Sequence, residues 1–431
     1  MSDEDKFDAI IVGGGVAGAI AALQLAKEGF QVVVIERGNY AGAKNMTGGR
    51  LYAHSLEKII PGFAKEAPVE RKVVKEKVSM MTATSAFTMD FASDELAQEA
   101  KDSYVVLRGV FDRWLMEQAE AAGAMVVTGI LVEDLIMKDG RVVGISAGGD
   151  EMLADVVVLA DGANSLLVTK AGLRKNKIEP HQMAVGAKEI IELGEKVIED
   201  RFNVSPGEGA AWLFAGYPSD GLIGGGFLYT NKDTISLGLV VTLSEFQKAK
   251  KSLPQMLDDF KKHPTVAPLI KGGKLVEYSG HMVPEGGYDM IPDLYADGVV
   301  VVGDAASLVI NVGYTVRGMD LAIASADAAA KAIIEAKKAN DFSANALAQY
   351  KTLLDQSFVI KEMKHFRKFP HFMENPRMFT AYPQMVAEMM SQLYVVDGSD
   401  PKSLMSKMMK PARKVGLLNL MKDGFKGMRA L

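Results

Sequence analysis

Apolar and polar residues near the N-terminus alternate in the order of a strand, a turn, a helix and a second strand. The apolar run FDAIIV at 7–12 is followed by glycines, by the helical pattern AGAIAALQLAKEG and by a second apolar run, QVVVIE. This order predicts a βαβ unit with buried parallel strands. The same texture returns at GVVVVGDAA and in the alanine-rich helical segment that runs to about residue 339. We therefore expect a discontinuous Rossmann-type domain at residues 1–170 and 299–340.

The middle of the chain has a different pattern. The runs AAWLFAGY, GGGFLYT and TISLGLVVTL, all within 171–298, predict antiparallel strands with a turn at 231–233. Residues 341–431 are helical in pattern, basic and rich in methionine. The predicted fold class is α/β: a split Rossmann-type domain, an antiparallel β domain at 171–298 inserted into it, and a helical C-terminal region at 341–431.

Composition narrows the chemistry. The 431 residues include no cysteine, which excludes disulfides, thiol catalysis and an iron–sulfur cluster held by cysteines of this chain. The six histidines are scattered without zinc-ligand spacing, so no metal site is expected. A net charge of −5 gives no reason to expect nucleic acid as a partner. The acidic N-terminus lacks a signal core and no apolar run is long enough to span a bilayer, so the expected location is cytoplasmic.

A glycine motif follows the first predicted strand. Gly13, Gly15 and Gly18 match G-x-G-x-x-G at the start of the helix, and Glu36 lies 23 positions after Gly13 at the end of the second strand. Such glycines allow a tight turn, a close approach to a diphosphate and close packing of helix on strand, while the acidic residue accepts hydrogen bonds from a ribose. A dinucleotide is therefore the predicted ligand, and the motif alone does not separate NAD from FAD.

Three further strand-end features favour FAD. Arg108 precedes Asp112 by four residues at the head of a helical segment, Asp161-Gly162 follows DVVVLA, and Gly303-Asp304 follows VVVV. Each has an ordinary alternative, a helix N-cap for Asp112 and simple turns for the other two. In this order they resemble the p-hydroxybenzoate-hydroxylase-like class of flavoproteins. That resemblance implies that Arg108, Asp161 and Asp304 support the flavin, the diphosphate region and the ribityl chain respectively.

The same resemblance implies two more positions. Val132, in a strand after the Asp112 helix, would contact the adenine. The helix after Asp304 would present its N-terminus to the pyrimidine edge of the flavin, with Gly313 at that turn, and a helix dipole there would stabilise the reduced anionic flavin.

Longer segments narrow the resemblance. GAKNMTGGRLYAHSLEKIIPGFA, GGGFLYTNKDTISLGLV, GGKLVEYSGHMVPEGG and NVGYTVRGMDLAIASA together resemble FixC-type relatives of electron-transfer-flavoprotein–quinone oxidoreductase, over nearly the whole chain. The resemblance implies that electrons arrive from an electron-transferring flavoprotein heterodimer, pass through FAD and leave to a membrane quinone. Residues 44–50 would border the isoalloxazine ring. Gly224 and Gly225 would lie beside the quinone, or would mark an ordinary β-bulge or close sheet crossing.

The longer members of that family carry a cysteine-ligated iron–sulfur domain. Because this chain has no cysteine, the resemblance implies a separate small ferredoxin-like subunit. No catalytic side chain is expected, since the chemistry would take place on FAD. The expected cofactor-binding set is Gly13, Gly15, Val16, Ala17, Gly18, Glu36, Arg37, Lys44, Thr47, Gly48, Gly49, Arg50, Arg108, Val132, Asp161, Gly162, Gly303, Asp304 and Gly313, with Gly224 and Gly225 on the quinone side.

The C-terminal tail differs in charge from the rest of the chain. Residues 401–431 hold eight Lys or Arg and one acidic residue, Asp423, in a chain whose net charge is −5. On a helical projection six apolar residues share one face: Leu417, Leu418, Leu420, Met421, Phe425 and Met428. Asn419, Lys422, Asp423, Lys426 and Arg429 share the other. Such a helix either packs internally or lies on a partner or on the inner face of the cell membrane, as a peripheral contact.

Other functions stay open at this point. An NAD(P)H-dependent aromatic hydroxylase and an isoprenoid-lipid reductase would use the same fold and cofactor. A non-catalytic binding module on the same scaffold would lack flavin altogether.

Overall fold

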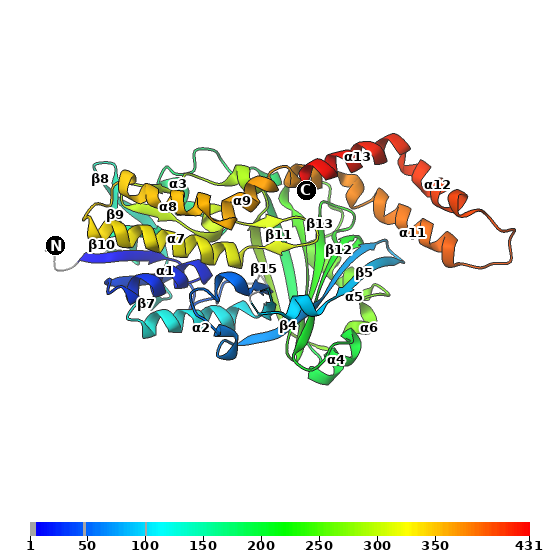
Figure 1. Ribbon diagram of the computed structural model, residues 1–431, viewed down its shortest axis with the longest axis horizontal. Helices are drawn as coiled ribbons and strands as arrows, with labels where there is room; N and C mark the ends of the chain where they lie inside the picture. Colours follow the sequence, from blue (N-terminus) through cyan, green and yellow to red (C-terminus); the bar gives the residue numbers. More distant parts are fainter. Residues whose placement is uncertain (1–5, 46–48, 100) are drawn as a thin grey trace.

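A computed structural model describes residues 6–45, 49–99 and 101–431. The molecule is elongated, with the N-terminus at one end and the C-terminal helices at the other (Figure 1). Two main sheets lie along it. The buried apolar runs of the N-terminal half form the first sheet, and the strands of the central region form most of the second.

The first sheet has the predicted parallel centre. β1 pairs in parallel with β2 on one side and with β10 on the other, and β10 pairs in parallel with β17. Its central strands are buried on both faces, which explains their continuous apolar runs. The strands are β1 (Lys6–Val12), β2 (Val32–Glu36), β7 (Met125–Thr128), β8 (Val132–Lys138), β9 (Arg141–Ala147), β10 (Asp150–Leu159), β16 (Tyr295–Ala296) and β17 (Val299–Val301).

Helices with apolar faces cover this sheet. α1 packs against the sheet and contacts both α2 and α7, while α8 packs on α7. The alanine-rich α7 ends at Lys338, as the pattern predicts, and most of its small side chains are buried. The helices are α1 (Val16–Lys27), α2 (Arg108–Ala121), α3 (Leu166–Lys170), α7 (Met319–Lys338) and α8 (Ala344–Gln356).

The second sheet runs in the order β15-β11-β14-β13-β12-β4-β6-β3, with β5 paired to β4. Its inner face packs on α5, whose Phe260 is fully buried against Phe214. The strands are β3 (Arg50–Tyr52), β4 (Val69–Met81), β5 (Ala86–Ala92), β6 (Ser103–Val106), β11 (Met183–Glu192), β12 (Glu208–Gly216), β13 (Gly224–Thr230), β14 (Thr234–Thr242) and β15 (Lys274–Pro284). The helices are α4 (Glu195–Phe202), α5 (Leu253–Lys262) and α6 (Ala267–Ile270).

The division expected from the sequence differs from this topology at one place. Residues 50–106 fall inside the expected segment 1–170, yet β3, β4, β5 and β6 belong to the second sheet. β4 pairs in parallel with β12 over its length, from Lys72 opposite Glu208 to Met81 opposite Gly216. The second sheet is therefore built from two separate stretches of the chain.

The C-terminal region is helical, as expected. α11 packs against β4 and β5 and runs outward, and α12 and α13 then return along it towards the body, where α13 contacts α10, as the orange and red helices of Figure 1 show. The helices are α9 (Phe358–His365), α10 (Phe369–Met373), α11 (Ala381–Tyr394), α12 (Leu404–Val415) and α13 (Leu417–Ala430). Among the helices of the described residues, none combines the length and the apolar character that crossing a bilayer requires.

The side of α13 that packs against the rest of the molecule is not the apolar face of the helical projection. Asp423, Gly427 and Ala430 are its buried residues, and Asp423 accepts hydrogen bonds from Arg377 and Tyr382. Asp423 was expected on the solvated polar face. Because a carboxylate with three donors is well satisfied inside, it faces inward and turns the large apolar side chains outward.

Candidate functional site

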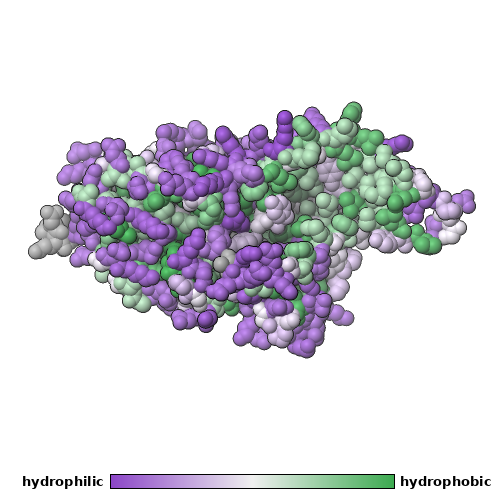
Figure 2. Space-filling model, in the orientation of Figure 1, coloured by the Kyte–Doolittle hydropathy of each residue, from purple (hydrophilic) through white to green (hydrophobic). Residues whose placement is uncertain are grey.

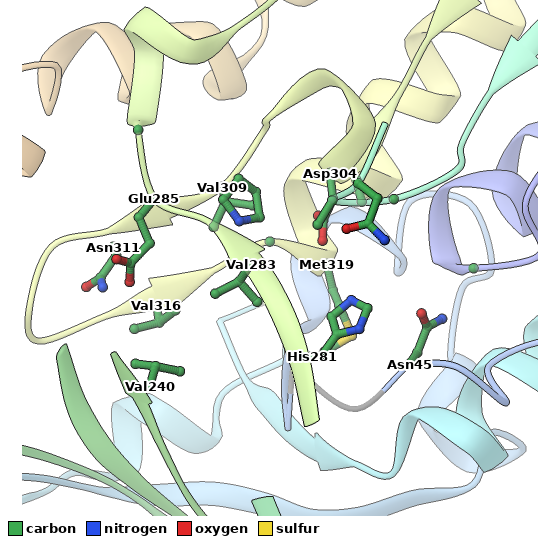
Figure 3. Close-up of a pocket in the computed structure, with 18 of the residues that line it drawn as sticks. Asn45, Val240, His281, Val283, Glu285, Asp304, Val309, Asn311, Val316 and Met319 are labelled. Atoms are coloured by element: carbon green, nitrogen blue, oxygen red, sulfur yellow. The ribbon is translucent and has the colours of Figure 1, made fainter. Parts of the chain in front are cut away.

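A cavity of about 670 Å³ lies where the two sheets meet. Its walls come from the glycine turn after β1, the ends of β2, β10 and β17, the strands β13 to β15 and the start of α10. Figure 3 shows polar side chains from these separate segments pointing into it, among them Asn45, His281, Glu285 and Asp304. Segments far apart in the sequence therefore share one site.

The glycine turn has the close contacts that its motif predicts. Gly13 has a φ of +103°, and a Cβ on Gly18 would lie 1.9 Å from the carbonyl oxygen of Gly13, so helix and strand could not pack with a side chain there. Gly15 is the N-cap residue of α1 and lines the cavity. The N–H groups of the first turn of α1 are thus directed to the cavity, where the helix dipole favours an anion.

Glu36 is held beside this turn by backbone donors. The amide of Gly14 donates to Oε2 (2.7 Å) and the amide of Gly38 donates to Oε1 (2.6 Å). The side chain is buried but lines the cavity. Each carboxylate oxygen keeps lone-pair capacity for a further donor, such as a ribose hydroxyl.

Arg108, which lines the cavity, forms a buried ion pair with Asp112. Arg108 is the first residue of α2 and donates from Nε and Nη2 to the two oxygens of Asp112 (2.7 and 2.8 Å). Asn45 Nδ2 donates to the same carboxylate (2.6 Å). Asp112 lies inside the helix, so the N-cap alternative does not apply. Its carboxylate fixes the guanidinium that lines the cavity and anchors the loop at Asn45.

Two further acidic residues line the cavity with strongly perturbed environments. Burial raises the pKa of Asp161 to about 6, and its Oδ1 is buried without a hydrogen-bond partner in the described residues. Burial also raises the pKa of Asp304, against the attraction of Arg108. Buried carboxyl groups of this kind need donors from a bound molecule, such as hydroxyl groups.

The start of α7 borders the cavity, but not in the expected way. Gly313 lies in the turn of a short hairpin formed by β18 (Ile310–Asn311) and β19 (Val316–Arg317), and the helix begins after it, at Met319. A short hairpin therefore separates the turn at Gly313 from the start of α7, and the role of Gly313 beside a flavin stays a prediction. Gly313, Gly318 and Met319 nevertheless all line the cavity.

Most of the predicted cofactor residues that the structure describes line this one cavity. These are Gly13, Gly15, Val16, Ala17, Glu36, Arg37, Lys44, Gly49, Arg50, Arg108, Val132, Asp161, Gly162, Asp304 and Gly313. Gly18 and Gly303 instead lie behind the wall, where the amide of Gly303 donates to Ser325 Oγ (3.0 Å). Thr47 and Gly48 lie outside the described residues.

Gly224 and Gly225 line the opposite side of the cavity. A Cβ on Gly224 would lie 2.1 Å from the carbonyl oxygen of Val240, and one on Gly225 would lie 2.6 Å from that of Phe214. Both contacts are with the paired neighbouring strands of the same sheet, β14 and β12, so they are not a crossing of two sheets. The two glycines also line the cavity.

Sequence reasoning missed several side chains here. Four of the lining side chains had no expected role: His281, Glu285, Asn311 and Arg317. Asn45 also lines the cavity, and it lies within the segment 44–50 that was expected to border the flavin ring. Arg317 donates to Asp320 in the first turn of α7 and to Glu362 of α9, which holds its guanidinium in place. Burial alone would raise the pKa of Asp320, but hydrogen bonds from His54 and Arg317 lower it below its ordinary value.

Comparison with known proteins identifies the family. Residues 369–431 match the ETF-QO/FixC family C-terminal domain, where ETF-QO denotes electron-transfer-flavoprotein–quinone oxidoreductase, and residues 183–283 match the ETF-QO ubiquinone-binding domain. The chain is 58% identical to the probable electron transfer flavoprotein-quinone oxidoreductase YdiS of Escherichia coli K12, across the full length of both. This chain belongs to the ETF-QO/FixC family. It is also 57% identical to the protein FixC of Salmonella typhi, over 99% of this chain and 100% of that one.

The ETF-QO/FixC chain also has the fold of solved flavoenzymes. Residues 8–112 match the FAD dependent oxidoreductase family. A geranylgeranyl bacteriochlorophyll reductase-like protein from Thermoplasma acidophilum superposes with a TM-score of 0.72 at 19% identity, covering 97% of this chain and 99% of the other. The flavin-dependent halogenase CmlS superposes with a TM-score of 0.64 at 20% identity, over 97% of this chain and 78% of that one.

The cavity of this ETF-QO/FixC family member fits FAD. A helix N-terminus for a diphosphate, a fixed carboxylate at Glu36 and an unpartnered buried oxygen on Asp161 are the donor and acceptor types that a flavin adenine dinucleotide satisfies. The chain is an FAD-dependent oxidoreductase, as the sequence predicts.

Proposed function

We propose that this protein accepts electrons from an electron-transferring flavoprotein and passes them through FAD to a membrane quinone. The observation that supports this most directly is the continuity of the cavity. Its lining includes the glycine turn at Gly13 and Gly15 and also residues from the ubiquinone-binding segment, 183–283. An acceptor in the second part would therefore stand beside a cofactor in the first.

The proposed cofactor roles follow the cavity wall. The first turn of α1 would bind the diphosphate, Glu36 the adenosine ribose and Val132 the adenine. Asp304 would bind the ribityl chain, and Arg108, held by Asp112, would support the flavin. Bound FAD would supply reversible one- and two-electron transfer. The chain would orient the cofactor and exclude water from it.

The acceptor side would be the wall that contains Gly224 and Gly225. The absence of side chains there leaves room for a flat ring against the strands β13 and β14. Phe379, from the C-terminal region, also lines the cavity and would cover the acceptor. The C-terminal region therefore belongs to the proposed acceptor site.

We also propose that the protein lies on the inner face of the cell membrane. Large apolar side chains of β5 and of the C-terminal helices are exposed, and Figure 2 shows them as a broad green area over this end of the molecule. The most exposed members are Tyr394, Val395, Val396, Leu404, Met405, Leu418, Met421 and Met428, and Met89 of β5 is also exposed. Apolar side chains mixed with basic residues suit an anionic bilayer, in which a quinone is dissolved.

A vesicle test separates this surface from the rest of the exterior. Leu418 and Met421 are 82% and 72% exposed, and the double change Leu418→Asp with Met421→Asp should abolish co-sedimentation with anionic phospholipid vesicles. Met137→Asp changes a side chain that is 48% exposed on β8, far from the tail, and should leave binding intact. Equal binding by both variants would contradict the proposed membrane contact.

Electron transfer is tested on the purified protein with its FAD. The protein is photoreduced and its reoxidation timed with a quinone analogue, a ferredoxin and an electron-transferring flavoprotein. We expect fast reoxidation by the quinone and fast exchange with the flavoprotein. A small iron–sulfur subunit is also proposed, since this chain contains no cysteine to hold a cluster. Slow reaction with all three would refute the proposed function, and rapid flavin reduction by NADPH with an aromatic substrate would favour a hydroxylase instead.

A further inference from the structure

One carboxylic acid in the cavity has no role in the function proposed so far. Glu285 directly follows β15 and lines the cavity together with His281 and Val283, its alternate neighbours on the same strand. In Figure 3 its carboxyl group points towards the side of the cavity where Asn311, Val316 and Val240 lie, and away from His281 and Asp304. It therefore faces the proposed acceptor end.

The position of Glu285 is fixed from two directions. Its amide donates to the carbonyl oxygen of Gln182 (2.7 Å), and its Oε2 accepts a hydrogen bond from Thr242 Oγ1 (3.1 Å). Thr242 ends β14, the strand whose Val240 and Val241 pair with Gly225 and Gly224. The hydrogen bond from Thr242 therefore links Glu285 to β14, the strand that pairs with Gly224 and Gly225 of β13.

The surroundings leave this acid without a cation. The charged and titratable side chains on neighbouring elements are His281 of β15, His181 before β11, Asp289, Arg317 of β19, and His371 and Glu374 at α10. Asp289 pairs with Arg367, Arg317 pairs with Asp320, and His371 lies near Glu374. Among the described residues, no ion pair with Glu285 is formed. Burial accordingly raises its pKa, and the single hydrogen bond from Thr242 only partly opposes this, so the acid tends to keep its proton.

We propose that Glu285 is the proton donor to the electron acceptor in this cavity. This inference rests on the proposed function. A quinone becomes a hydroquinone by taking up two electrons, which the reduced cofactor supplies, and two protons. In one O–H step the Glu285 carboxyl O–H bond breaks and a new O–H bond forms at a quinone oxygen, leaving a carboxylate. A proton from bulk solvent, relayed to the edge of the cavity, then reprotonates the Glu285 carboxylate, and a second solvent proton passed on in the same way completes the hydroquinone.

A donor is needed because the reduced acceptor would otherwise carry negative charge in an enclosed cavity, where solvation is poor. A positioned acid removes that charge as it develops, and such groups typically contribute about 10²- to 10⁴-fold in rate. The raised pKa favours the protonated form of the acid, which is the form that a donor needs.

The test compares two acceptors on the full-length protein with its FAD. Glu285→Gln keeps the shape of the side chain but carries no transferable proton. After photoreduction, reoxidation by a soluble quinone analogue should slow by roughly 10²-fold or more. Reoxidation by ferrocenium, which takes one electron and no proton, should stay within about twofold of the unchanged protein. The wild-type quinone rate should fall at high pH, and this limb should disappear in the variant.

Two further variants serve as controls for this experiment. Glu277→Gln makes the same chemical change on the exposed part of β15 and should leave both rates unchanged. Glu285→Asp retains an acid and should recover part of the quinone rate. An unchanged quinone rate in Glu285→Gln, or an equal loss with both acceptors, would overturn the inference. Wild-type protein that does not react with the quinone at all would overturn the proposed function, and this inference with it.

Discussion

The buried pair of Arg108 and Asp112 provides the sharpest energetic prediction. Asp112 is 0% exposed and its two oxygens accept three hydrogen bonds, two from Arg108 and one from Asn45. Asp112→Ala removes the carboxylate and with it the two hydrogen bonds and the ion pair that Arg108 makes to Asp112. Breaking one partner of such a pair typically costs about 3–5 kcal/mol in the free energy of unfolding.

That cost is large enough to measure directly. Each kcal/mol lowers the melting temperature by about 2–4 °C in domains of 150–250 residues, so a drop of roughly 6–20 °C is expected. Circular dichroism on flavin-free protein isolates this effect, because bound cofactor would add its own stabilisation. With FAD present, the same variant should also bind the cofactor more weakly, since Arg108 lines the cavity and would no longer be held in place.

Two controls separate the pair from general damage. Asp112→Asn keeps one acceptor oxygen for Arg108 and should melt between the wild type and the alanine variant. Asp134→Ala removes an exposed acid that pairs with Lys170 at the surface and should leave the midpoint unchanged. A flavin-free Asp112→Ala protein that melts within about 2 °C of wild type would refute the reasoning.

Three further predictions concern single acids. Asp304→Ala should lose most bound FAD while keeping the far-ultraviolet circular dichroism of the fold, and an unchanged visible spectrum would contradict the proposed ribityl role. Burial raises the pKa of Asp161 from 3.8 to about 6, so the folded protein binds this proton more tightly than the unfolded chain does. The stability of flavin-free protein should therefore fall as the pH rises from about 4 to 6, and urea midpoints of Asp161→Asn should lack that part of the slope. Asp423→Ala removes the acceptor for Arg377 and Tyr382 and should speed tryptic cleavage near Lys402 without changing the flavin spectrum; cleavage at the wild-type rate would show that α13 is held by other contacts.

The sequence predicts those parts of the molecule whose structure is determined by residues within one short segment. The glycine turn is an example, because the 1.9 Å approach at Gly18 and the positive φ at Gly13 allow no other residue type without strain. Glu36 follows from its fixed distance along a βαβ unit. Asp112 is likewise indicated by a fixed spacing, four residues after Arg108. Only the structure shows that it is the buried partner of Arg108 and not an N-cap.

Other features depend on contacts between distant segments. β4 reads VERKVVKEKVSMM, which is too polar to resemble a central strand, yet it pairs with β12 about 130 residues later. The hairpin around Gly313 consists of two-residue strands, below what any periodicity can reveal. For such elements the deciding energy lies in pairing across the fold, which local propensity does not record.

Glu285 shows where a local signal did exist but lacked its context. Strand alternation puts His281, Val283 and Glu285 on one face, and two ionisable side chains on one strand face are a reason to look for a site. The proposed role of Glu285 depends on two contacts that the sequence does not show. Thr242 donates a hydrogen bond to its carboxyl group, and the strand of Thr242 pairs with the strand of Gly224. Because burial raises the pKa of this acid and only Thr242 binds it, its chemistry is set by the sheet around it and not by any motif. In the proposed function the acceptor half of the cavity would supply protons through a residue that ends one of its strands, while the dinucleotide half would hold the electron-supplying cofactor at a turn whose residues are nearly consecutive.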